Sequence, residues 1–166
     1  MTHRTFPSLP RFICMAIHTL QKIQIIPAPI QTVWDFFATP INLAAITPKN
    51  LRFKILTPQP IASMHEGQIL EYNVYPFLGI PLYWKTIIRD VDFQKRFADE
   101  QVKGPYKKWY HEHLFRSVDQ GTEMTDNLSY ELPLGVVGEI AHGLLVKNQV
   151  REIFDFRYDV IAKFKW

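Results

Sequence analysis

Two histidines that stand two residues apart are the side chains of this sequence best placed to do chemistry. His111 and His113 lie in the segment Trp-Tyr-His-Glu-His-Leu-Phe-Arg, residues 109–116, where they alternate in step with Trp109 and Phe115. In a β-strand, residues two apart point to the same face of the sheet. An imidazole gains or loses a proton near neutral pH and also coordinates metal ions. The segment therefore predicts a strand whose inward, aromatic face presents two titratable rings.

A carboxylate is predicted to lie opposite one of these rings. Residues 119–121, Asp-Gln-Gly, predict a turn after the histidine strand. A register that pairs Ser117 with Thr122 places Asp126 opposite His113. A carboxylate there would fix one imidazole tautomer, so that the other ring nitrogen could exchange a proton with a ligand. It would equally satisfy two buried polar groups, and we expect this structural role because few paired histidines act as general bases.

A metal site has little support in the sequence. His111, His113 and Asp126 superficially resemble a catalytic zinc set, but neither a fourth group nor a known spacing accompanies them. Cys14 is the single cysteine, which excludes an intrachain disulfide and fits a reducing cytoplasm. We expect no metal and no cofactor.

Composition indicates one soluble globular domain. The 166 residues are 47% hydrophobic and 21% charged, and a chain of this length buries roughly two thirds of its unfolded surface. The net charge is +3 and the basic residues are scattered, which argues against nucleic-acid binding. No stretch approaches the roughly 18 apolar residues that span a membrane. We expect a disordered tail over residues 1–14, one domain over residues 15–166 and a cytoplasmic location.

Local patterns predict one strand, two short helices, six more strands and a long helix. The expected strands are 16–26, 52–57, 68–75, 82–93, 97–103, 109–117 and 122–131. The expected helices run from Pro29 up to Pro40, over 42–46 and over about 137–164, and a turn is expected over 76–81. The last helix is predicted to be apolar on the face of Ile140, Leu144, Val150, Phe154, Ile161 and Phe164. Consecutive strands covered by one long helix are typical of an α+β fold.

Three further charged residues belong to these elements. Asp99 and Glu100 point to opposite faces of their strand, so only one of them can face inward, and both could instead decorate an edge of the sheet. Arg157 lies at the margin of the helix's apolar face. Its side chain could pair with an inward carboxylate or with an anionic group of a ligand, but we expect it to extend past apolar neighbours to water.

The order of elements and several motifs resemble the START/Bet-v-like (SRPBCC) superfamily. Within it, the chain is most similar to a bacterial branch described as polyketide-cyclase-like or ligand-binding. The motifs are Pro29–Phe37 with Pro40 and Leu43, Phe97–Gln101, Gly104–Tyr106, Trp109, His111, His113 and Phe115, Gly121–Thr122, Met124–Asp126, and Tyr130 with Pro133–Gly135. The likeness covers about residues 17–164. It implies a helix-grip fold, in which a seven-stranded, curved antiparallel sheet wraps a long C-terminal helix, with two short helices after strand one.

The resemblance also implies a cavity between sheet and helix, because members of the superfamily bind lipids, hormones, sterols or polyketides there. We therefore expect an apolar or amphipathic, lipid- or polyketide-like ligand. The residues expected to contact it are Tyr72, Trp84, Trp109, His111, His113, Phe115, Met124, Asp126, Tyr130 and Phe154. Two alternatives stay open. One is a cyclase or dehydratase with His113 as general acid or base, Asp126 orienting it and His111 or Tyr130 binding a substrate oxygen. The other is a protein–protein interaction module.

Overall fold

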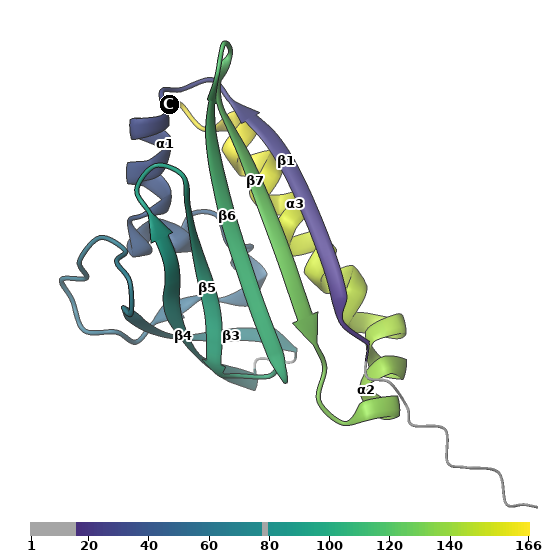
Figure 1. The fold of residues 1–166 in the computed structure, drawn as a ribbon. Helices are drawn as coiled ribbons and strands as arrows, with labels where there is room; N and C mark the ends of the chain where they lie inside the picture. The colour runs from purple at the N-terminus through teal and green to yellow at the C-terminus, as the bar shows by residue number, and fades with distance from the viewer. Residues whose placement is uncertain (1–15, 78–79) are drawn as a thin grey trace, which may run out of the picture.

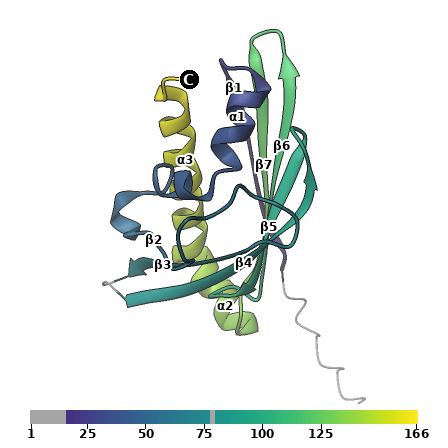
Figure 2. The same cartoon turned by 90° about the vertical axis from the view of Figure 1, so that its left-hand side faces the viewer.

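The computed structural model describes residues 16–77 and 80–166. These residues form a seven-stranded antiparallel sheet that curves around helices on its concave side (Figure 1). Figure 2 shows α3 lying across that side, with α1 beside its C-terminal end. The α+β helix-grip fold is therefore confirmed. The predicted tail over residues 1–14 lies outside the described residues.

The sheet has the strand order β1-β7-β6-β5-β4-β3-β2. Its strands are β1 (His18–Ile26), β2 (Lys54–Ile55), β3 (Ile69–Phe77), β4 (Ile80–Asp92), β5 (Arg96–Lys103), β6 (Lys108–Val118) and β7 (Gly121–Glu131). Strands β2 to β7 follow one another as neighbours, and only β1 pairs across the chain, with β7. Because side chains alternate along each strand, every second residue is buried in the middle of β4 and β6 and along most of β7.

The hairpin between β6 and β7 has the predicted register. Ser117 pairs with Thr122 and His113 pairs with Asp126. Gly121 begins β7 with φ +130°, and a Cβ added there would lie 2.2 Å from the carbonyl oxygen of Ile26. Only glycine tolerates this approach, so the turn residue fixes the register that brings the imidazole opposite the carboxylate.

The short helices differ in part from the prediction. Helix α1 (Ile30–Phe37) follows Pro29 as expected and buries Val33, Trp34 and Phe37. The second short helix, predicted over 42–46, is present as a 3-10 helix two residues earlier, η1 (Pro40–Ala44), and a further 3-10 turn, η2 (Lys49–Leu51), follows it. A proline fits the first turn of a helix, so each turn starts at or directly after one: Pro40 begins η1 and Pro48 precedes η2.

Two strand boundaries also need correction. The strand predicted over 52–57 shrinks to β2, because Arg52 takes a left-handed conformation with φ 43°. The turn predicted over 76–81 is narrower than predicted, because β3 continues to Phe77, which pairs with Ile80 at the start of β4; residues 78–79 lie outside the described residues. An irregularity in the ladder after Val74 accommodates the proline that follows at position 76.

The C-terminal helix is continuous but irregular. It consists of α2 (Gly135–Ala141), one π-helical turn η3 (His142–Val146) and α3 (Lys147–Lys163). The face of α3 that meets the sheet buries Val150, Phe154, Arg157 and Ile161. The predicted apolar face is wrong at its start, where Ile140 and Leu144 are 59% and 70% exposed. Figure 1 gives the reason, since α2 lies beyond the end of β7 and has no sheet to cover.

The buried apolar side chains form two clusters. The larger one joins α1 to the sheet and to the end of α3, with Trp34, Phe97, Phe115 and Ile161 among its members. The smaller one lies further along the helix around Tyr130, Val150 and Phe154, and also includes Leu128. This packing anchors α3 over the sheet at two places, and residues of both clusters also line the cavity described below.

Candidate functional site

A cavity of about 340 Å³ lies between the concave face of the sheet and the helices. Its walls come from β3 to β6 on one side and from α1, η1, α2, η3 and α3 on the other. Aromatic rings pack against one another along the sheet wall. Trp84 stacks on Tyr72 at 5.9 Å between ring centres and meets Trp109 edge-on at 5.1 Å. Such walls favour apolar and aromatic ligands.

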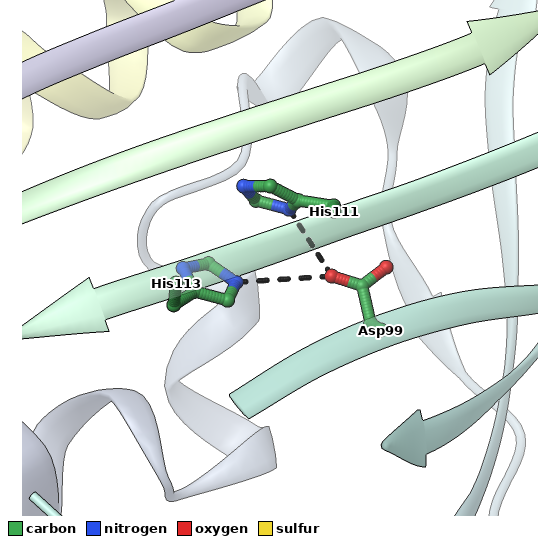
Figure 3. A group of neighbouring side chains, drawn as sticks. All are labelled: Asp99, His111 and His113. Carbon is green, nitrogen blue, oxygen red and sulfur yellow. Dashed lines mark ion pairs between the residues drawn. The ribbon is translucent and has the colours of Figure 1, made fainter. Parts of the chain in front are cut away.

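Three polar side chains converge on this wall from β5 and β6 (Figure 3). Asp99 Oδ2 lies 3.1 Å from His111 Nδ1 and 3.7 Å from His113 Nε2. Trp109 Nε1 donates a hydrogen bond to the other carboxylate oxygen, Asp99 Oδ1, at 3.3 Å. Asp99, His111 and His113 all line the cavity. The arrangement therefore presents a fixed carboxylate and two imidazoles to whatever occupies it.

Asp126 lies behind the two rings and does not line the cavity. Its Oδ1 is 2.9 Å from His111 Nε2, in a hydrogen bond, and also 2.9 Å from His113 Nδ1. The second contact is close but misaligned, since His113 Nδ1 makes no hydrogen bond with any described residue. Asp126 is thus shared by both rings. The predicted pairing with His113 is close in distance, but the hydrogen bond goes to His111.

The electrostatics of this cluster favour ionised carboxylates. Burial alone would raise the pKa of Asp99 and of Asp126, but the hydrogen bond from His111 and the nearby His113 ring outweigh it. The pKa of both carboxyls therefore lies well below its usual range. Burial would lower the pKa of His111, yet its hydrogen bonds to Asp126 and Asp99 raise it overall. The sheet side of the cavity thus carries fixed negative charge that His111 partly balances.

Two further donors of the cavity wall have no acceptor. Trp84 Nε1 and Arg157 Nε are buried without a hydrogen-bond partner in the described part of the chain. The Arg157 side chain is 7% exposed, and its guanidinium carbon lies 5.1 Å from the centre of the Phe154 ring. Buried donors are nearly always paired, so two in one cavity indicate a place for acceptor atoms.

Six of the ten residues expected to contact a ligand line the cavity: Tyr72, Trp84, Trp109, His111, His113 and Phe154. The other four do not. Phe115 and Met124 belong to the core under α1, Tyr130 to the smaller core cluster, and Asp126 lies behind the histidines. All four are on the inward face as predicted, but α1 and α3 cover that part of the sheet.

The sequence did not decide whether Asp99 or Glu100 faces inward, and it wrongly predicted that Arg157 reaches water. Asp99 faces the cavity, whereas Glu100 faces outward and pairs with Arg89 at 3.3 Å. Arg157 was expected to reach water, but it is buried in the cavity wall. Asp99 lies two residues after Phe97 on the same strand, so the two side chains point to the same face of the sheet, and Phe97 is fully buried. The apolar Phe97 could therefore have indicated that Asp99 faces inward. For Arg157, its spacing of three and four residues from Phe154 and Ile161 placed it on the buried stripe.

Solved structures of similar fold come from bacteria and plants. A protein from Chromobacterium violaceum aligns with a TM-score of 0.66 at 12% identity, over 88% of this chain and 96% of its own. The ginseng major latex-like protein 151 from Panax ginseng aligns with a TM-score of 0.61 at 16% identity, over 87% and 95%. Norcoclaurine synthase from Thalictrum flavum, solved in complex with dopamine and hydroxybenzaldehyde, aligns with a TM-score of 0.60 at 13% identity, over 99% of each chain. At these identities the likeness shows the fold alone.

Sequence comparison identifies the family. Functionally curated proteins include no significant match. None of the helices in the described residues is long and apolar enough to cross a membrane. A family profile described as "Polyketide cyclase / dehydrase and lipid transport" matches residues 26–154, and the SRPBCC resemblance read from the motifs agrees with it. Because this match covers well over half of the chain, the protein belongs to the polyketide cyclase / dehydrase and lipid transport family.

Proposed function

We propose that the protein binds an amphipathic small molecule in the cavity, with its apolar body against the aromatic wall and an anionic oxygen group at Arg157 and Trp84. The observation that carries this proposal is the pair of unpartnered donors in a mostly apolar cavity. The fold can hold small aromatic molecules, since norcoclaurine synthase was solved in complex with dopamine and hydroxybenzaldehyde.

The apolar part of the ligand supplies most of the affinity. Tyr72, Trp84, Trp109 and Phe154 offer ring faces and edges to the cavity. Burying about 300 Å² of apolar ligand surface at about 25 cal/mol/Å² contributes on the order of 7 kcal/mol before the costs of association. An apolar body alone is therefore enough for useful binding, but it does not select one ligand over another.

The donors supply selectivity. Arg157 has no ion-pair partner among the described residues, although it is almost fully buried. Tyr72 adds a phenol to the same cavity, and burial raises its pKa well above the usual value, so it remains a donor. A buried guanidinium without a counter-ion is costly, and a ligand carboxylate, sulfonate or enolate would offset that cost. We infer that ligands with such a group bind more tightly than neutral analogues of the same shape.

A fluorescence titration with 8-anilinonaphthalene-1-sulfonate tests whether the cavity binds such a molecule. This probe combines two aromatic ring systems with one sulfonate. We expect saturable binding of one probe per chain. Replacing Ile153, which lines the cavity from α3, by tryptophan should fill the space and weaken binding at least tenfold.

The matched control places the same large side chain on the solvent side of the helix. Glu152→Trp adds an indole at an exposed position next to Ile153 and should leave the titration unchanged. Equal binding by wild type and Ile153→Trp would show that the probe binds elsewhere, and would contradict the proposal.

A further inference from the structure

Asp99, His111 and His113 bring three donor atoms of the kinds that transition metals bind to one point of the cavity wall. One carboxylate oxygen and one nitrogen of each ring all lie within 4.8 Å of one another. The carboxylate comes from β5 and both rings from β6, where Asp99 and His111 are direct cross-strand partners. The three ligands are therefore held by the backbone of two neighbouring strands rather than by loops.

The spacing of these atoms fits a small divalent ion. Zinc bonds to nitrogen and oxygen are about 2.0–2.2 Å long, so two ligand atoms of a tetrahedral ion are separated by about 3.4 Å. Asp99 Oδ2 lies 3.1 Å from His111 Nδ1 and 3.7 Å from His113 Nε2, on either side of that value. Small side-chain rotations would admit an ion between them (Figure 3).

Asp126 has the place of an outer-shell partner. A histidine that binds a metal through one nitrogen commonly donates its other N–H to a carboxylate, which fixes the ring and strengthens the ligand. Asp126 Oδ1 is hydrogen-bonded to Nε2 of His111 at 2.9 Å and lies 2.9 Å from Nδ1 of His113, where a small ring rotation would align a second hydrogen bond. A carboxylate therefore lies on each side of the two rings, Asp99 on the cavity side and Asp126 behind them.

Charge balance also favours a dication. Asp99 and Asp126 place two carboxylates around two rings whose centres are only 4.1 Å apart. A divalent ion between Asp99 and the two rings would balance the charge of both carboxylates at once. Because all three ligands line the cavity, the ion would keep an open coordination position towards a bound molecule.

We propose that Asp99, His111 and His113 form a binding site for a divalent transition-metal ion, with Asp126 positioning both histidines. The donor set of two imidazoles and one carboxylate suits Zn²⁺ and Fe²⁺ rather than Mg²⁺ or Ca²⁺. The sequence alone argued against a metal because neither a fourth ligand nor a known spacing accompanied His111, His113 and Asp126. The structure instead brings Asp99 to the rings on the cavity side and leaves Asp126 behind them.

Metal titration of the chelator-treated, full-length protein tests this site. Zn²⁺ added as its chloride should bind at one ion per chain, measured by competition with a chromophoric chelator. Asp99→Asn and His113→Gln keep the side-chain shapes and should abolish this stoichiometric binding. Asp126→Asn should retain one ion per chain but bind it about 10–100-fold more weakly.

The exposed histidine His65 provides the matched control. It lies outside the cavity, and His65→Gln should bind Zn²⁺ as wild type does. Binding below about a tenth of an equivalent in the wild type, or equal binding by Asp99→Asn and wild type, would overturn the proposal.

Co²⁺ gives a second readout that needs no variant. A visible spectrum of tetrahedral or five-coordinate Co²⁺ is expected, and a purely octahedral, hydrated spectrum would contradict the site.

Discussion

Asp99 and His111 are direct partners across β5 and β6, and Asp99 Oδ2 lies 3.1 Å from His111 Nδ1. This pairing faces the cavity, so a carboxylate and an imidazole are fixed at a wall that is otherwise mostly apolar. On the opposite side, Arg157 of α3 contributes a buried cation. The cavity therefore has polar side chains on both its sheet side and its helix side.

Arg157 is expected to lower the stability of the ligand-free protein. Arg157→Met keeps the length of the side chain and removes a buried donor without an acceptor. We expect the free energy of unfolding to rise by about 1–2 kcal/mol, the usual cost of such a group. Urea denaturation measures this change in the free energy of unfolding. Arg151→Met, at an exposed position of the same helix, should change stability by less than about 0.5 kcal/mol. A loss of stability in Arg157→Met would show that the guanidinium is already satisfied.

The indole N–H of Trp84 is expected to serve the ligand, and that of Trp109 is not. Trp84→Phe should weaken binding of 8-anilinonaphthalene-1-sulfonate about tenfold, because an N–H to a charged acceptor is lost. Trp109 also lines the cavity, but its N–H already donates to Asp99. Trp109→Phe should therefore change probe affinity less than threefold. Equal losses in both variants would mean that ring packing, not the free donor, sets the affinity.

Phe97 is expected to support both the core and the histidine cluster. It is 1% exposed, and its ring lies 4.5 Å from that of His113. Phe97→Ala should reduce the free energy of unfolding by about 3–5 kcal/mol, measured by urea denaturation. Phe93, which meets the same Trp34 ring from the surface, is 62% exposed, so Phe93→Ala should cost less than about 1.5 kcal/mol. Similar losses in the two variants would contradict this assignment of the core.

Gly121 is expected to be indispensable for the hairpin. Gly121→Ala meets a positive φ and a backbone oxygen at 2.2 Å, so stability should fall by at least about 2 kcal/mol. Gly143 lies in η3, where an added Cβ meets no atom within 4 Å. Gly143→Ala should instead be neutral or stabilise by up to about 1 kcal/mol. Thermal unfolding followed by circular dichroism compares them. Loss of stability in Gly143→Ala alone would show that the turn tolerates a side chain.

Local patterns were sufficient for the hairpin that carries the histidines. The alternation of His111 and His113, together with the short turn before Gly121, fixed both the inward face and the register opposite Asp126. A tight turn leaves few registers, so residues close in sequence could be paired from the sequence. The long amphipathic helix was equally visible, because its buried residues recur at helical spacing over α3.

Longer-range relations were not visible in the same way. Asp99 meets His111 only after β5 and β6 are aligned, and the loop of residues 104–107 between them does not specify that alignment. The depth of Arg157 depends on how closely α3 packs on the sheet, which the helix's own periodicity does not determine. Ile140 and Leu144 continue the apolar pattern beyond the end of β7, where nothing covers them in the described structure. Each case concerns packing between elements rather than the form of one element.

The most direct test of the proposed function compares two probes that differ in one group. 8-Anilinonaphthalene-1-sulfonate and N-phenyl-1-naphthylamine share their ring systems, but only the first carries a sulfonate. Arg157→Met should weaken binding of the sulfonate probe about 10–100-fold and change binding of the neutral probe less than threefold, because only the sulfonate pairs with the buried guanidinium. Equal changes for both probes, or no binding of either by the wild type, would contradict the account.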